Sequence, residues 1–296
     1  MPEDSTIQVE GRIVKGVGGF YYVRSADTTY ECRARGRFRK DGITPLVGDL
    51  VSCTIDKVSN TGMISEILPR KNFLIRPPVA NITQIAIVFS VANPKPNLRT
   101  IDKLISSAMY AGISPVICIN KTDLESGGKL FDIYSSSGFD TICVSALENS
   151  NIDLLMERLA GEITVFAGNS GVGKSSLLNR VLKDVDLEVG AVSNRVERGR
   201  HTTRHSELIP LENNEGYIID TPGFSSFSVS DFDIEKLPGL FPEFAQYTDR
   251  CKFQDCSHTV EDGCAVLQAL ENGKIQKSRH DSYLEQYNEI KSKKIY

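Results

Sequence analysis

The chain has 296 residues, of which 40% are hydrophobic and 24% are charged, and its formal net charge is −4. This composition is typical of a folded protein of two or three domains and excludes a disordered or fibrous chain. The negative charge excludes a uniformly basic coat, so any contact with nucleic acid must come from local patches. No segment approaches the ~18–20 consecutive apolar residues that cross a bilayer, and the N-terminus has no signal-peptide pattern. We therefore expect a cytoplasmic protein without a membrane partner.

The first 70 or so residues carry a pattern of short strands separated by Gly, Asp and Asn turns. The predicted strands lie within residues 11–25, 28–40, 48–56 and 61–68. Such spacing favours a small β-barrel. In the second segment the residues that alternate with Tyr30, Cys32, Ala34 and Phe38 are Arg33, Arg35, Arg37 and Arg39. Because successive side chains of a strand point to opposite faces, we expect these guanidinium groups on one exposed face.

From about residue 72 the pattern changes to strands and helices in alternation, which predicts a parallel sheet covered by helices on both faces. The predicted strands are residues 82–90, 115–120, 141–146, 162–168 and 216–220, and the predicted helices are one capped by Thr100, one at 152–160 and one at 174–182. Beyond about residue 227 the strands stop. Two helices are expected there, one ending at Gly273 and a final one that carries Tyr283, Leu284, Tyr287 and Ile290.

A glycine-rich segment lies between the predicted strand 162–168 and the predicted helix 174–182. It reads Gly168, Asn169, Ser170, Gly171, Val172, Gly173, Lys174, Ser175, Ser176 and fits G-x-x-x-x-G-K-[ST]. In such a loop the backbone N–H groups and the helix N-terminus converge on phosphate oxygens. Lys174 is expected to reach the β- and γ-phosphates, and Ser175 to ligate Mg²⁺. The alternative is a glycine turn without a ligand.

The base is chosen by a second motif, Asn120, Lys121, Thr122 and Asp123, at the end of the predicted strand 115–120. The Asp123 carboxylate can accept hydrogen bonds from guanine N1–H and the exocyclic amine, and adenine offers neither partner. Asn120 is expected to face N7, and the pair Ser145-Ala146 to present a backbone N–H to O6. Alone, these residues could be an Asp-ended turn. Together with the P-loop they predict GTP and GDP as ligands.

Two further segments fit the switches of a GTPase. Asp220, Thr221, Pro222 and Gly223 follow the predicted strand 216–220, where Asp220 can hold Mg²⁺ through water and the Gly223 N–H can meet the γ-phosphate. The segment 199–203 is polar, and either Thr202 or Thr203 could complete the Mg²⁺ shell. The alternative is a solvated loop with no catalytic part.

The chain has seven cysteines, an odd number that favours buried thiols or metal ligands over disulfides in a reducing compartment. Four of them lie in strand-like runs and are expected to be packing thiols: Cys32, Cys53, Cys118 and Cys143. The others form, with one histidine, the group Cys251, Cys256, His258 and Cys264. Three thiolates and an imidazole are the ligands of a closed, structural zinc site. The alternative is a set of unligated thiols.

The order of these motifs differs from that of an ordinary small GTPase, which starts with the P-loop and ends with the base motifs. Here the base motifs come first. Because the termini of a compact domain are often close together, the same sheet and site can be built from a chain with this permuted order. With its leading barrel and trailing Cys/His group, the chain resembles the circularly permuted GTPase family that acts in maturation of the small ribosomal subunit. The resemblance implies an OB-fold barrel at 1–71, a permuted GTPase domain at 72–226 and a mainly helical zinc-binding domain at 227–296. It also implies a monomer that hydrolyses GTP and binds the small subunit and its rRNA.

Catalysis is the point at which this sequence departs from Ras-like enzymes. Those enzymes position the attacking water with a Gln just after the D-x-x-G motif, where this chain has Phe224. The family resemblance points instead to His201, although a lone histidine in a loop is otherwise a surface residue. A kinase or ATPase of the P-loop class is disfavoured by the N-K-T-D motif. An RNA-binding adaptor that holds GTP without hydrolysing it is kept open by Phe224.

An oligonucleotide-binding barrel would use its strand face and loops for RNA. Arg33, Arg35 and Arg37, with Tyr21, Tyr22 and Phe38 nearby, provide charge and stacking surfaces for such binding. The alternative is a basic strand face that is only solvated.

Overall fold

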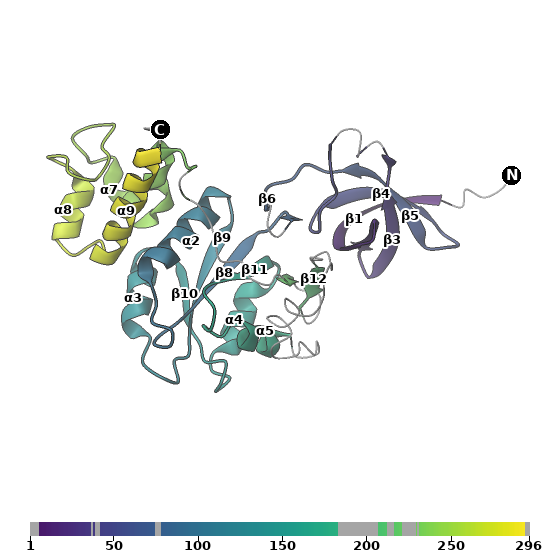
Figure 1. Cartoon of the computed structure of the whole chain (residues 1–296), viewed down its shortest axis with the longest axis horizontal. Helices are drawn as coiled ribbons and strands as arrows, with labels where there is room; N and C mark the ends of the chain where they lie inside the picture. Colours follow the sequence, from purple (N-terminus) through teal and green to yellow (C-terminus); the bar gives the residue numbers. More distant parts are fainter. Residues whose placement is uncertain are drawn as a thin grey trace. The chain divides into compact units, whose positions relative to one another are not determined.

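The computed structural model describes residues 6–36, 38, 42–74, 78–182, 207–211, 216–220, 229 and 231–293 (Figure 1). These residues form two compact units. One contains the described residues of Met1–Thr83, Leu159–Val165 and Gly190–Phe224, and the other those of Gln84–Arg158, Phe166–Val189 and Ser225–Tyr296. The finer division at 1–71, 72–226 and 227–296 stays a prediction. Among the helices described, not one offers a bilayer-spanning apolar stretch.

The first unit contains a closed five-stranded barrel, as the strand pattern predicts. Its strands are β1 (Thr6–Val17), β2 (Phe20–Ser25), β3 (Thr28–Ala34), β4 (Leu50–Asp56) and β5 (Thr61–Ile67). Neighbours pair in the order β1-β2-β3-β5-β4, and pairing of β4 with β1 closes the barrel. The interior is filled by alternate, fully buried side chains of all five strands: Ile13, Val23, Cys32, Val51, Cys53, Ile55 and Ile64.

The prediction of an arginine row along one strand is wrong. Strand β3 ends at Ala34, so Arg35 lies beyond it, and Arg37 and Arg39 lie outside the described residues. The chain leaves the sheet because it turns to bury Phe38, whose N–H donates to the Arg35 carbonyl at 3.1 Å. Of the predicted row only Arg33 is on the strand. Its guanidinium carbon lies 4.5 Å from the centre of the Phe20 ring.

Three further strands belong wholly or partly to the same unit. They are β11 (Ile163–Ala167), β12 (Glu207–Pro210) and β13 (Tyr217–Asp220). β13 pairs in parallel with β11 and antiparallel with β12, and β12 pairs in turn with barrel strand β1. A short hairpin of β6 (Phe73–Leu74) and β7 (Val79–Ala80) follows the barrel in the sequence.

The second unit is built on the parallel strands β8 (Gln84–Ser90), β9 (Ser114–Asn120) and β10 (Asp140–Cys143), with β9 in the middle. Every residue of β8 is buried, as expected of a strand covered on both faces. The helices are α2 (Leu98–Tyr110), α3 (Gly128–Ser136), α4 (Ile152–Leu159) and α5 (Lys174–Val181). Figure 1 shows α2 and α3 on one side of these strands and α4 and α5 on the other, which confirms the predicted alternation.

Helix α2 begins earlier than predicted. Its N-cap is Asn97, and Thr100 lies in the first turn. The Asn97 side chain accepts a hydrogen bond from the Thr100 N–H at 3.3 Å and so satisfies one of the free donors at the helix start. Asparagine and threonine are both good N-caps, and the sequence pattern alone did not separate them.

The C-terminal part of this unit contains no strand among its described residues. It consists of η2 (Ile234–Leu240), η3 (Pro242–Phe244), α7 (Ala245–Thr248), α8 (Ala265–Glu271) and α9 (Lys277–Lys293). At its centre Tyr283 packs edge to face against Phe241 and Phe244, with ring centroids 5.2 and 5.0 Å apart, and the two phenylalanine rings stack with centroids 5.4 Å apart. After α8, Gly273 adopts a positive φ of 67°, which confirms the predicted helix end.

Candidate functional site

The P-loop, residues 168–176, connects β11 to α5, and two of its glycines are required by close backbone approaches. A Cβ at Gly168 would lie 2.0 Å from the Val88 carbonyl oxygen, and one at Gly173 would lie 2.2 Å from Asn120 Nδ2. Both glycines also have positive φ, at 140° and 95°. Any larger residue would push the loop away from β8 or from the base motif.

Lys174 begins α5 and holds the loop in a curled form. Its Nζ donates to the carbonyl oxygens of Gly168 and Asn169, each at 2.7 Å. Burial lowers the pKa of Lys174, because the ammonium loses part of its hydration. A partly desolvated cation beside a helix N-terminus is a strong attractor for phosphate oxygens.

Asn120 joins three predicted motifs. Its Nδ2 donates to the Val172 carbonyl of the P-loop at 2.9 Å, and its Oδ1 accepts from the Ala146 N–H at 3.2 Å. The side chain is 1% exposed, so both bonds form away from water. Since an amide nitrogen has two hydrogens, one remains for the predicted contact with N7.

Lys121 makes a second connection that the sequence motif does not reveal. It adopts a positive φ of 65°, and its Nζ donates to the carbonyl oxygens of Gly171, at 2.7 Å, and Asn93. The next residue is also fixed, because Thr122 Oγ1 donates to the Val144 carbonyl at 3.0 Å. The base motif is therefore locked to the P-loop on one side and to the strand end before Ser145 on the other.

The Asp123 carboxylate is oriented by Ser145. The Ser145 hydroxyl, which is fully buried, donates to Asp123 Oδ1 at 2.5 Å. This contact brings together the two motifs that the sequence assigned to the base. It leaves Asp123 Oδ2 available to a ligand.

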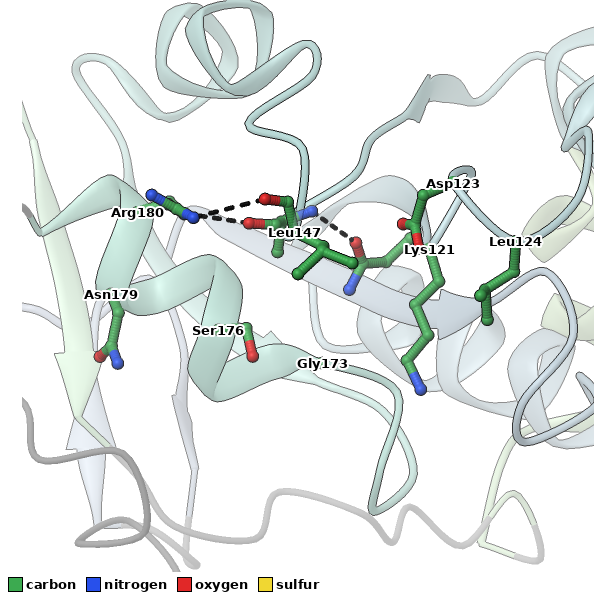
Figure 2. Close-up of a pocket in the computed structure, with 10 residues that line it drawn as sticks. Lys121, Asp123, Leu124, Leu147, Gly173, Ser176, Asn179 and Arg180 are labelled. Carbon is green, nitrogen blue, oxygen red and sulfur yellow. Dashed lines mark hydrogen bonds between the residues drawn. The ribbon is translucent and has the colours of Figure 1, made fainter.

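A cavity of about 550 Å³ opens between these motifs and α5 (Figure 2). Its lining residues are Asn120, Lys121, Asp123, Leu124, Ala146, Leu147, Gly173, Ser176, Asn179 and Arg180. Leu124 and Leu147 are 55% and 76% exposed, which is unusual for leucine and provides apolar surfaces for a flat base. A volume of this size is in the range of small-ligand sites. Sequence reasoning missed Leu124, Leu147, Asn179 and Arg180, since none belongs to a motif.

Four predicted residues lie outside the described residues: His201, Thr202, Thr203 and Gly223. The backbone of Asp220 is described, as the last residue of β13, and its side chain lies outside the described part of the structure. Their roles stay predictions.

The second site is the group Cys251, Cys256, His258 and Cys264, whose ligand atoms all lie within 4.8 Å of one another. His258 Nδ1 is 3.6 Å from the Cys251 sulfur and 3.5 Å from the Cys264 sulfur, and these two sulfurs are 4.0 Å apart. Zinc bonds of about 2.3 Å to sulfur and 2.0–2.1 Å to nitrogen place tetrahedral ligands about 3.8 Å (S to S) and about 3.5 Å (S to N) apart. The residues present therefore fit a tetrahedral metal ion.

The backbone around this group is arranged to support thiolates. The Ala265 N–H donates to the Cys251 sulfur at 3.4 Å, and the Leu267 N–H donates to the Cys264 sulfur at 3.5 Å. The loop between the ligands is closed by Glu261, which accepts from the Ser257 and Thr259 N–H groups at 2.8 and 3.0 Å. Burial acts to raise the pKa of Glu261, but the hydrogen bond from the Ser257 hydroxyl, together with these backbone bonds, outweighs it and holds the pKa at about 2.

A parallel sheet with a P-loop, an N-K-x-D motif and a Ser-Ala turn around one cavity defines a P-loop GTPase, and the order of the motifs makes it circularly permuted. Residues 67–230 match the model of the RsgA GTPase family, and residues 10–64 match that of the RsgA N-terminal domain. The chain belongs to the RsgA GTPase family and is a GTP hydrolase.

Individual relatives match along nearly the whole chain. The small ribosomal subunit biogenesis GTPase RsgA of Ruminiclostridium cellulolyticum is 46% identical over 286 residues, which cover 95% of this chain and 93% of that protein. The solved structure of YloQ, a circularly permuted GTPase, superposes with a TM-score of 0.83 at 34% identity, covering 99% of this chain and 98% of YloQ. The solved structure of YjeQ from Thermotoga maritima gives a TM-score of 0.84 at 33% identity, and the match covers 96% of this chain and 99% of YjeQ.

Proposed function

We propose that the chain binds the small ribosomal subunit and couples hydrolysis of GTP, to GDP and phosphate, to the late maturation of that subunit. The observation that carries the nucleotide part is the junction at Asn120, which bonds both to the P-loop and to the Ser-Ala turn. The partner is supported by the relative from R. cellulolyticum, whose name specifies small ribosomal subunit biogenesis and which matches 95% of the chain. On this proposal the protein acts as a monomer in the cytoplasm.

In the nucleotide site, Asp123 reads the guanine amine and N1–H, and Asn120 faces N7. The Ala146 N–H, which Asn120 Oδ1 accepts at 3.2 Å, is shared with O6 as a second acceptor. The P-loop N–H groups and Lys174 bind the β- and γ-phosphates. The carbonyl oxygens of Gly168 and Asn169 hold the Lys174 ammonium at the centre of the loop, so little reorganisation is needed when phosphate arrives.

Hydrolysis depends on residues of the two switches. Ser175, Asp220 and either Thr202 or Thr203 would hold Mg²⁺, which when bound neutralises charge on the phosphate oxygens. Phe224 has no polar group with which to orient water. We therefore assign this role to His201, and we place the γ-phosphate sensor at the Gly223 N–H.

The remaining parts of the chain bind RNA and hold a metal. The barrel, an OB-fold in this proposal at 1–71, presents Arg33 over Phe20, with Tyr22 on the same face of β2, as a surface for rRNA. A GTPase domain at 72–226 and a zinc-binding domain at 227–296 complete the chain. In the latter, Cys251, Cys256, His258 and Cys264 hold one structural Zn²⁺.

The deciding experiment measures phosphate release from GTP by the purified protein alone, with small ribosomal subunits and with large subunits, and uses ATP as the control nucleotide. We expect slow GTP hydrolysis that only small subunits accelerate, and no hydrolysis of ATP. Hydrolysis that responds equally to both subunits would overturn the proposed partner. GTP binding without hydrolysis in any of the three conditions would favour the adaptor function.

A further inference from the structure

Arg180, near the end of α5, reaches the turn that lies beside the base motif. Its Nε donates to the Ala146 carbonyl at 2.9 Å and its Nη2 to the Leu147 carbonyl at 3.5 Å (Figure 2). Among the described residues, the Arg180 guanidinium forms hydrogen bonds with these two carbonyl oxygens and with no other group. The charge of Arg180 is thus directed at the backbone of the turn that presents the Ala146 N–H.

The two ends of this turn are joined, because Ser145 and Ser150 exchange backbone hydrogen bonds at 3.2 and 3.0 Å and the Glu148 N–H donates to the Ser145 hydroxyl at 3.1 Å, but its middle has less support. Leu147 is 76% exposed, so packing of its side chain does not fix the backbone. Hydrogen bonds hold the turn instead: Asn120 accepts the Ala146 N–H on one side, and Arg180 donates to the Ala146 carbonyl on the other. Bonds from a charged donor are about twice as strong as neutral ones. The position of the Ala146 N–H therefore depends on both side chains.

We propose that Arg180 is a positioning residue for guanine recognition, holding the Ala146–Leu147 turn at the distance at which its N–H can bond to O6. This inference rests on the proposed nucleotide site. It gives α5 two tasks: its first residue, Lys174, serves the phosphates, and Arg180, almost two turns later, serves the base. In this role Arg180 acts on the base through the turn, by its bonds to the Ala146 and Leu147 carbonyl oxygens.

The test compares two ligands of the full-length protein: GDP, and the diphosphate of 2-aminopurine riboside, which has the exocyclic amine but no O6. In Arg180→Ala we expect GDP affinity to fall about 5- to 10-fold, the loss of one charge-assisted hydrogen bond at a partly exposed site. Affinity for the 2-aminopurine nucleotide should change less than about twofold, because that base has no acceptor for the Ala146 N–H. Arg180→Lys should recover part of the GDP affinity, because an ammonium can still donate to one carbonyl.

The control is Arg158→Ala, which removes the same charge from α4, where Arg158 pairs with Asp140 at 2.7 Å, outside the cavity. It should leave the affinities for both nucleotides unchanged. Equal losses for both ligands in Arg180→Ala would show that Arg180 acts through its charge on the phosphates and would overturn the inference, as would unchanged GDP affinity. If the parent protein itself does not bind GDP, the proposed function fails and this inference fails with it.

Discussion

Arg279 Nη1 donates to Asp102 Oδ1 at 2.6 Å, joining α9 in the C-terminal part of the chain to α2 beside the nucleotide-binding strands. The two side chains are 0% and 1% exposed. Arg279 Nε also donates to Glu243 at 2.7 Å, and the rings of Phe241 and Phe139 lie 4.6 and 5.1 Å from the guanidinium carbon. One buried cation thus holds three segments together, so the C-terminal region is tied to the GTPase fold by charge as well as by apolar packing.

Replacing this cation should destabilise the protein strongly. In Arg279→Met, Asp102 and Glu243 would be left buried, close together and uncompensated, and we expect the free energy of unfolding to fall by about 3–5 kcal/mol. The control is Lys277→Met, because Lys277 is 80% exposed in its ion pair with Asp281 and should change stability by less than about 0.5 kcal/mol. Urea denaturation followed by circular dichroism measures both. Similar losses in the two variants would contradict the role assigned to Arg279.

Base selectivity should change with Asp123. In Asp123→Asn the amide can donate to the 2-oxo group of xanthine, while the acceptor for the guanine amine is weakened, so the preferred nucleotide should become XTP. We expect GTP affinity to fall by on the order of 10²-fold or more, since unpaired polar groups in a base site are costly. Competition binding with GTP, XTP and ATP measures this change. Unaltered preference for GTP would mean that Asp123 does not read the base.

Nucleotide binding and hydrolysis should be separable. Lys174→Ala should lose phosphate affinity, because the half-buried ammonium at the centre of the P-loop is removed, whereas the exposed Lys129→Ala on α3 should bind as the parent does. His201→Ala should keep GTP binding and lose hydrolysis, with a fall of about 10²-fold or more in turnover as expected for a residue that activates water. Equilibrium binding and single-turnover phosphate release measure the two effects. Unchanged turnover in His201→Ala would remove the histidine from the mechanism.

The Cys/His group should hold about one zinc ion per chain in protein that is purified without chelators. Cys264→Ser should lose the metal and lower the unfolding temperature, because a structural zinc contributes its binding energy to folding. Cys143→Ser is the control, since Cys143 lies at the end of β10 and outside the cluster, and it should retain the zinc. Elemental analysis and thermal unfolding measure both variants. Metal-free parent protein would contradict the prediction.

We expect the C-terminal region to respond to whether GTP or GDP is bound. Fewer than 30 residues separate Gly223 from Cys251. The intervening chain contacts α2, since the rings of Phe232 and Tyr110 stack with centroids 4.2 Å apart. We expect higher affinity for small ribosomal subunits with a GTP analogue than with GDP, and by linkage the subunits should tighten binding of the analogue by the same factor. Equal subunit affinity in the two states would exclude this coupling.

Several features of the fold and site could be predicted because short, continuous stretches of sequence determine them. The P-loop and the N-K-T-D motif are each a single unbroken run of residues. Both follow the ends of parallel strands, which meet at one edge of a sheet. The alternating strands of the barrel and the buried run of β8 follow from side-chain periodicity. The Cys/His group spans only 14 residues, Cys251 to Cys264, and its ligand atoms meet as the sequence predicts.

Other features depended on tertiary contacts. The arginine row failed because burial of Phe38 ends β3 at Ala34, which strand periodicity cannot foresee. Arg180 carries no motif, and only the folded chain places it against the Ala146–Leu147 turn.

By itself the sequence determined the class of fold, the nucleotide and phosphate motifs, their permuted order and the candidate metal ligands. The tertiary structure alone decided how these parts are held in place: Asn120 between two motifs, Lys121 on the P-loop, and Arg279 on Asp102 across 177 residues of chain. The physical reason is that propensity and periodicity act over a few residues, whereas a buried hydrogen bond or ion pair forms only where folding excludes water from both partners.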